Sequence, residues 1–245
     1  MFSREKKMIR NLTKNQKTIR RRLLKILYEA KASHIGSCFN SLDIIDSIYA
    51  VKKADEPCIL SNGHAAAALY IILEKYKYLT KPDIKKLGYH PNRNTDYGIE
   101  VSTGSLGQGL PIAAGMALAD RSKNVYCIVS DGECTEGSIW ESLRVIKELT
   151  LSNLKIIVSA NGWGAYGPIC ARDLQRRIRG FGFRLVHIDG HRTKNIMEEL
   201  KTKHSGAVIF FAKTSSEQLP FLQGNSAHYY IMDRDGYTTA MKEFK

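Results

Sequence analysis

A strand–helix–strand unit near the middle of the chain most limits how it can fold. Two short apolar runs rich in β-branched residues, 125–130 and 154–160, stop at the turn signals Asp131-Gly132 and Asn161-Gly162. Between them, residues 136–149 have helical spacing with one apolar stripe. Strands joined through a helix pair in parallel with a right-handed crossover. We therefore expect Asp131 and Asn161 to lie side by side at the sheet edge where open α/β sheets bind ligands.

The rest of the chain repeats this alternation, which predicts one α/β domain over residues 1–245 with a parallel sheet flanked by helices. Further strands are expected at 58–61, 184–188 and 207–212. Helices are expected at 15–32, 41–50 with Ser41 as the cap, 65–78, 80–87 with Thr80 as the cap, 105–121, 173–179 and 193–203. Residues 1–14 form a basic extension and 215–245 an irregular tail, with helical spacing at 237–244.

Composition limits the setting in which this domain works. Hydrophobic residues make up 43% of the 245 residues, enough for a substantial core. No apolar stretch reaches the roughly 18 residues of a membrane span, and the first residues lack the apolar core of a secretory signal. The five cysteines form no CxxC pair, which favours reduced thiols and the cytoplasm.

The net charge of +13 is concentrated in two basic clusters. The first is Arg4, Lys6, Lys7, Arg10, Lys14, Lys17, Arg20, Arg21, Arg22 and Lys25, and the second is Arg172, Arg176, Arg177 and Arg179. Solvated helix faces explain both clusters, and a general attraction for anionic sugar phosphates is the next interpretation. Nucleic acid binding is disfavoured because no aromatic interleaving or zinc-knuckle spacing accompanies the charge.

The pair of oxygen ligands at the two strand ends suggests a metal. A carboxylate at Asp131 beside an amide oxygen at Asn161 suits a hard divalent cation that also takes phosphate oxygens, Mg²⁺ or Ca²⁺. An ordinary turn after each strand would give the same short pattern, so this pair alone does not decide the function.

The spacing of Ser130-Asp131-Gly132 and Asn161 resembles the diphosphate-binding motif of thiamine-diphosphate enzymes. Further segments resemble, in the family's order, the N-terminal domain of transketolases. These are Ser33-His34-Ile35-Gly36-Ser37, Leu60-Ser61-Asn62-Gly63-His64, Tyr89-His90-Pro91, and Val101 to Gly109, which contains Thr103-Gly104-Ser105-Leu106-Gly107-Gln108-Gly109. Several ordered motifs together are far more specific than any one of them, and residues 131–141 continue the resemblance.

The resemblance implies a role for each motif residue. Thiamine diphosphate would contact His64, Gly104, Ser105, Leu106, Gly132, Glu133 and Asn161. The metal would take oxygens from Asp131, Asn161 and the Trp163 carbonyl. The catalytic histidines would be His34, His64, His90 and His228, which polarise sugar hydroxyls and the carbonyl and exchange protons with them.

The resemblance also implies a partner. Transketolases carry a second domain that binds the aminopyrimidine ring and supplies a glutamate, and this chain shows no such domain. The expected assembly is a heterotetramer with a C-terminal transketolase subunit. Glu136 and Glu141 fall at family dimer-interface positions, or else they form a solvated helix start.

The expected function is two-carbon ketol transfer between sugar phosphates. A related synthase or decarboxylase that forms acyloins from a 2-oxo acid is one alternative, and a non-catalytic binding homologue is another. Departures from the family pattern at Ser130, Ser105 and the loop 161–167 point to a specialised substrate or a drifted enzyme.

Overall fold

The computed structural model describes residues 12–204, 206–224 and 226–245, and most of the basic N-terminal extension lies outside this range. Five parallel strands form one sheet in the order β1-β2-β3-β5-β4. The strands are β1 (Cys58–Leu60), β2 (Val125–Ser130), β3 (Leu154–Ala160), β4 (Arg184–Asp189) and β5 (Val208–Lys213). The predicted parallel α/β fold is confirmed, including the parallel pairing of the two central strands.

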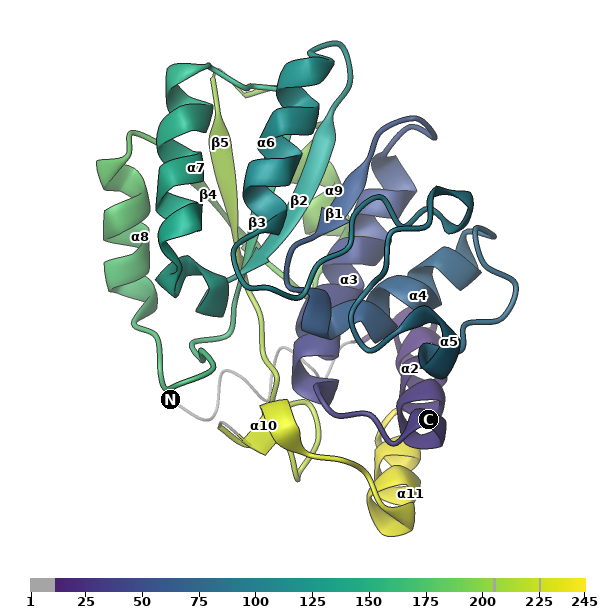
Figure 1. Ribbon diagram of the computed structural model, residues 1–245. Coiled ribbons are helices and arrows are strands. Elements are labelled where there is room, and N and C mark those ends of the chain that lie inside the picture. Colours follow the sequence, from purple (N-terminus) through teal and green to yellow (C-terminus); the bar gives the residue numbers. More distant parts are fainter. Residues whose placement is uncertain (1–11, 205, 225) are drawn as a thin grey trace.

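Helices cover both faces of the sheet (Figure 1). On one face lie α6 (Gly109–Ala119), α7 (Gly137–Glu148) and α8 (Ala171–Gly180). On the other lie α3 (Ile35–Val51), α4 (Ala66–Lys75) and α9 (Thr193–Lys201), and α2 (Lys14–Ala30) packs on α3 and α4. Alternate residues of a strand point to opposite faces of the sheet. Ile128 therefore packs with the helix layer that contains α3, whereas Cys127 and Val129 pack with the layer that contains α6.

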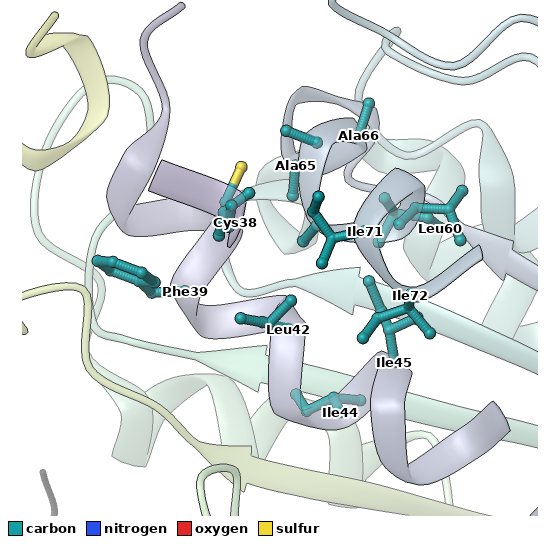
Figure 2. Packing of buried hydrophobic residues seen from close by; sticks show 14 of the residues in the cluster. Cys38, Phe39, Leu42, Ile44, Ile45, Leu60, Ala65, Ala66, Ile71 and Ile72 are labelled. Carbon is teal, nitrogen blue, oxygen red and sulfur yellow. The ribbon is translucent and has the colours of Figure 1, made fainter. Parts of the chain in front are cut away.

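Helix α3 forms the centre of one core layer. Its Leu42 and Ile45 pack beside Ile72 of α4, close to Leu60 of β1 (Figure 2). The prediction that a helix begins at Ser41 is wrong, because α3 starts at Ile35 and Ser41 is fully buried in its middle. A helix that is buried on nearly all sides has no amphipathic edge to mark its start.

Two further helix starts differ from the sequence prediction. Helix α5 (Ile84–Leu87) is capped by Asp83, whose carboxylate accepts a hydrogen bond from the Lys85 N–H, and not by Thr80. Helix α6 begins at Gly109 and not at residue 105. The cause is backbone conformation: Gly107 has a φ of 78°, which a right-handed helix cannot accommodate.

The C-terminal tail is more regular than predicted. It contains the short helix α10 (Ser226–Tyr229) and then α11 (Arg234–Glu243), which starts before the predicted helical stretch at 237–244. Asp233 caps α11 by accepting a hydrogen bond from the Gly236 N–H at 2.8 Å. Within the described residues, no helix is long and apolar enough to cross a membrane.

Arg20 is an exception to the prediction that the basic N-terminal residues form a solvated face. Its guanidinium is fully buried, and its two terminal nitrogens donate to both carboxylate oxygens of Asp43. The His191 ring lies 2.9 Å from the same carboxylate and accepts from the Ser215 N–H through its other nitrogen. Burial alone would raise the pKa of Asp43, but Arg20 and His191 hold it well below its usual value.

Replacing Arg20 with alanine is expected to lower the free energy of unfolding by about 3–5 kcal/mol, because Asp43 would remain buried without its main counter-ion. Arg22→Ala on the same helix is the matched control. Arg22 pairs with Glu74 at a partly exposed site, where loss of a pair costs about 1 kcal/mol or less. Urea unfolding followed by circular dichroism measures both values. Equal losses in the two variants would contradict the structural role of the Arg20–Asp43 pair.

Candidate active site

Asp131 and Asn161 occupy neighbouring strand ends, as the sequence predicts. Strands β2 and β3 pair up to Ser130 and Ser159, so the residues that follow emerge side by side. The Asp131 carboxylate accepts a hydrogen bond from the Gly162 N–H at 2.7 Å and another from the Gly132 N–H at 3.1 Å. The turn after β3 is therefore fastened directly to the acidic residue after β2.

A pocket opens at these strand ends and is here called the strand-tip pocket. Its lining includes Asp131, Gly132, Asn161 and Trp163 from the sheet edge. The remaining lining residues are Ser37, Asn40, Asn62, His64, Leu106, Ser130, Ser159, Gly164, Ala165, Ser216, Gly224, Ala227 and His228. The walls thus come from α3, the loop after β1, the loop before α6 and the C-terminal tail.

The charge of Asp131 lacks a counter-ion in this pocket. The side chain is almost fully buried, and among the described residues it forms no ion pair with a lysine, arginine or histidine. Burial raises the pKa of its carboxyl to about 7, although the Gly162 and Gly132 amides oppose this shift. A buried carboxylate of this kind can remain ionised at neutral pH when a cation joins it.

Two residues with oxygen atoms suited to a divalent cation, Asn161 and Trp163, line the same pocket as Asp131. Asn161 is fixed by its side-chain oxygen, which accepts from the Trp163 N–H at 2.7 Å. The Trp163 carbonyl oxygen lies 3.7 Å from where a Cβ on Gly132 would stand. The described residues contain no cluster of three His, Cys, Asp or Glu side chains that could hold a metal. A carboxylate, an amide oxygen and a backbone carbonyl oxygen fit a hard cation that takes further oxygens from a ligand.

Ser130, which departs from the family glycine, has a local role. Its hydroxyl accepts a hydrogen bond from the Glu133 N–H at 3.2 Å, at the start of the short 3-10 turn Gly132–Thr135. The hydroxyl also lies 3.4 Å from the Glu133 carboxylate. Serine at this position thus supports the turn that carries Gly132.

Three of the four predicted histidines come together. The His34 and His228 ring centres lie 4.5 Å apart, and His64 lies 5.4 Å from His34 and 5.2 Å from His228. His34 has a φ of 65°, and its N–H donates to the His228 carbonyl at 3.0 Å. The tail is therefore hydrogen-bonded to the start of α3, which brings His228 into the group.

Burial controls the protonation of these histidines. Desolvation lowers the pKa of His34 to about 4 and that of His64 to about 3, and it also lowers the pKa of His228. All three imidazoles are neutral at pH 7, so each offers one N–H donor and one nitrogen acceptor. Such groups suit hydrogen bonds to hydroxyl and carbonyl groups of an uncharged ligand.

The other predicted site residues lie around the strand-tip pocket without lining it. His90 is exposed, and its ring packs against Gly104, where an added Cβ would come within 2.7 Å of the ring. Gly104 therefore provides room for His90. Ser105 is also exposed and outside the lining, whereas its neighbour Leu106 does form part of the wall.

The structure gives Glu133 a position different from the predicted cofactor contact. Its side chain is fully buried outside the lining, where its carboxylate accepts from the Ser61 hydroxyl at 2.6 Å and from the Gly107 and Ser130 N–H groups. Burial raises its pKa, and these donors oppose that shift. Glu133 thus ties together the three loops that surround the pocket.

The sequence prediction does not include several lining residues. Ser37 and Asn40 lie on the first turns of α3, which precede the predicted helix start, and Ser216 comes from the tail. Within the described residues, the side-chain oxygens of Asn40 and Asn62 are buried without a hydrogen-bond partner. The Asn62 amide donates to Ser41 at 2.9 Å, which fixes its orientation.

The match to a family model decides the family. Residues 13–207 match the model of the transketolase, thiamine diphosphate binding domain. The chain belongs to the transketolase family. Members of this transketolase family catalyse group transfer, and most of the strand-tip pocket lies within the matched thiamine-diphosphate-binding domain.

Relatives of two lengths resemble this transketolase domain. The chain is 26% identical to an apulose-4-phosphate transketolase subunit from Actinobacillus succinogenes, over 96% of each protein. It is 27% identical to the protein of the same name from Phocaeicola vulgatus, over 91% of this chain and 90% of the relative. A crystal structure of Campylobacter jejuni transketolase shares the fold with a TM-score of 0.80 and 23% identity, over 97% of this chain but 43% of that one.

Glu136 and Glu141, which the sequence predicts at an interface or in a solvated helix start, are not buried within this chain. Glu136 immediately precedes α7 and lies close to Gly107. Glu141 is exposed and pairs with Arg144 at 2.6 Å. Helix α7 packs beside α6, which carries the exposed apolar side chains Ile112 and Leu118.

Proposed function

We propose that this chain is the diphosphate-binding subunit of a split transketolase that transfers a two-carbon ketol unit between sugar phosphates. The observation that carries the proposal is the buried, uncompensated carboxylate of Asp131 beside the oxygens of Asn161 and Trp163. These residues would hold a magnesium ion, which would neutralise Asp131 and offset the charge of a bound diphosphate. The family match of residues 13–207 supports thiamine diphosphate as the source of that diphosphate.

Residues in and beside the strand-tip pocket have distinct proposed roles. Asp131, Asn161 and the Trp163 carbonyl would hold the cation, while Gly132 would leave space for the diphosphate and Leu106 would supply an apolar wall. Thiamine diphosphate, when bound, supplies the carbanion that accepts the two-carbon unit. His34, His64 and His228 would orient sugar hydroxyls and exchange protons with them as neutral imidazoles.

The lining of the pocket favours a hydroxylated substrate over a 2-oxo acid. Among the described residues that line it, none is a lysine or arginine that could pair with a substrate carboxylate. His64 and His228, which line the pocket, and His34 beside them instead match a chain of hydroxyl groups. Ketol transfer is therefore preferred over acyloin formation from a 2-oxo acid.

A second subunit would complete the site. The chain spans 96% of a relative named as a subunit but 43% of the Campylobacter transketolase. The exposed Ile112 and Leu118 on α6 would pack against a partner that carries the pyrimidine-binding domain, in a heterotetramer. The five cysteines are all free thiols, in keeping with a cytoplasmic enzyme.

Calorimetric titration of thiamine diphosphate into the chain, together with its partner subunit, tests the proposal. Saturable binding is expected with magnesium present, and little or none in its absence, because the diphosphate and Asp131 would otherwise repel each other. Thiamine without the diphosphate is the control and is expected to bind far more weakly. Binding that is equally strong with and without magnesium would contradict the proposed metal site.

His90→Ala is expected to lower turnover on sugar phosphates by roughly 10²–10⁴-fold, as for the loss of one polarising or acid–base group. Affinity for thiamine diphosphate should stay near wild type, because His90 lies outside the strand-tip pocket. His187→Ala, which removes an exposed histidine of β4, is the matched control and should retain full turnover. Steady-state assays with calorimetry separate the two effects, and unchanged turnover in His90→Ala would refute its role.

A further inference from the structure

A second cavity lies apart from the strand-tip pocket and shares none of its lining residues. It has a volume of about 360 Å³ and is here called the basic cavity. Its lining is Leu79, Thr80, Lys81, Asp83, Lys86, Leu87, Asn92, Arg93, Asn94, Tyr97 and Ile99. These residues come from the segment around α5 and from the loop that follows His90. The volume falls within the range of about 300–1,000 Å³ that is usual for small-molecule sites.

Positive charge dominates this cavity. Lys81, Lys86 and Arg93 line it, and none of the three forms an ion pair within the described part of the chain. Asp83 is the one acidic residue in the lining as described, and one of its carboxylate oxygens already accepts from the Lys85 N–H at 3.0 Å, where it caps α5. Three cations against one engaged carboxylate leave a net positive site.

Apolar and polar groups are also segregated in the basic cavity. Leu79 and Ile99 are buried and give it an apolar floor, whereas the Tyr97 side chain is 42% exposed. The amides of Asn92 and Asn94 add neutral donors. A ligand that matches this lining has an anionic group that pairs with the cations. It also has a short carbon skeleton that packs against Tyr97 and the apolar floor.

The walls of the cavity are held by hydrogen bonds. Tyr70 donates from its hydroxyl to the Leu87 carbonyl at 3.0 Å, and the Arg93 N–H donates to the Ser102 hydroxyl at 2.8 Å. Asn94 and Ile99 bond to each other through both backbone N–H groups, at 2.8 and 2.9 Å. These hydrogen bonds fix the backbone of the cavity walls before a ligand arrives. Less conformational entropy is therefore lost when a ligand binds.

We propose that the basic cavity binds the phosphate monoester of a small metabolite. Lys81, Lys86 and Arg93 would hold the phosphate, and Tyr97 with the apolar floor would hold its carbon chain. The ligand would contact residues on both sides of His90, because the lining includes residues that precede it and residues that follow it. Its occupancy would therefore restrain the loop that carries His90. This inference does not depend on the identity of the reaction at the strand-tip pocket.

Nuclear magnetic resonance titration of the isotope-labelled chain with ribose 5-phosphate tests the proposal. The buffer contains a chelator and no magnesium, so that phosphate binding at Asp131 is disfavoured. Ionic strength is held constant at about 0.15 M to separate binding from charge screening. Saturable shifts are expected at amides in residues 81–87 and 92–99. Ribose, which lacks the phosphate, should cause none, and inorganic phosphate should act more weakly than the ester.

Charge-reversal variants sharpen the result. Lys86→Glu and Arg93→Glu are each expected to weaken binding by roughly tenfold or more, as for the loss of a charge-assisted hydrogen bond. Arg177→Glu is the matched control, because Arg177 is exposed on α8 and lies outside the cavity. Binding that is lost equally in all three variants would show general electrostatic attraction and overturn the proposal. Shifts centred on residues 131–132 and 161–164, or shifts that do not saturate, would also overturn it.

Discussion

Asp131→Ala is expected to abolish magnesium-dependent binding of thiamine diphosphate, with a loss of more than about 100-fold in affinity. Changes to residues that only support a metal ligand already cost about 10–100-fold in metal affinity, and Asp131 would be a ligand itself. It provides the one carboxylate among the described residues that line the strand-tip pocket. Without it, only neutral oxygens from Asn161 and Trp163 would remain to hold the cation against the diphosphate. Calorimetry on the complex with the partner subunit measures the affinity directly.

Two control variants separate loss of the charge from disturbance of the turn. Asp131→Asn can keep the hydrogen bond from the Gly162 N–H, which is 2.7 Å long in the wild type, but it removes the negative charge. It should therefore unfold like wild type and still bind the cofactor poorly. Asp173→Ala, which alters a carboxylate on α8 outside the pocket, should bind normally. Wild-type affinity in both Asp131 variants would rule out the proposed metal site.

The sheet and the position of Asp131 beside Asn161 can be predicted because they depend on local patterns. A short β-branched run that ends at a turn signal specifies a strand, and a helix between two such runs specifies their parallel pairing. The residues after each strand then meet at one edge without any knowledge of side-chain packing. His64, in the short 3-10 turn Gly63–Ala65, and Leu106, in the loop before α6, are expected from the family resemblance and not from these patterns, and both line the pocket.

What cannot be predicted depends on contacts between distant parts of the chain. The sequence predicts that Arg20 is solvated, because Asp43, which binds it, and His191, which contacts Asp43, are distant from it in the sequence. Helix α3 is buried on nearly all sides, so no amphipathic period marks its first turns or the lining residues that they carry. Glu133 lies close to Asp131 in sequence but points away from the pocket, because the Ser61 hydroxyl and two backbone amides bind its carboxylate.

The isolated chain is expected to show no ketol transfer, and transfer should appear when a subunit with the pyrimidine-binding domain is added. In the strand-tip pocket, the acidic lining residue is Asp131, whose carboxylate faces the turn that would hold the diphosphate. The lining, as far as the structure describes it, has no second carboxylate that could protonate the aminopyrimidine ring of the cofactor. We therefore expect that carboxylate to come from the partner. Coupled assays of the chain alone, the partner alone and the mixture measure the dependence.

Variants on α6 connect this dependence to a surface. Leu118→Glu would place a charge in the apolar contact proposed for the partner, so it should weaken association and lower transfer at limiting partner concentration. Excess partner should restore much of that loss by mass action. Ile231→Glu is the matched control, because Ile231 is similarly exposed but lies in the C-terminal tail. Robust transfer by the chain alone would contradict the split site, since the site would then be complete within one subunit. An equal loss in both variants would instead remove the evidence that α6 forms the contact.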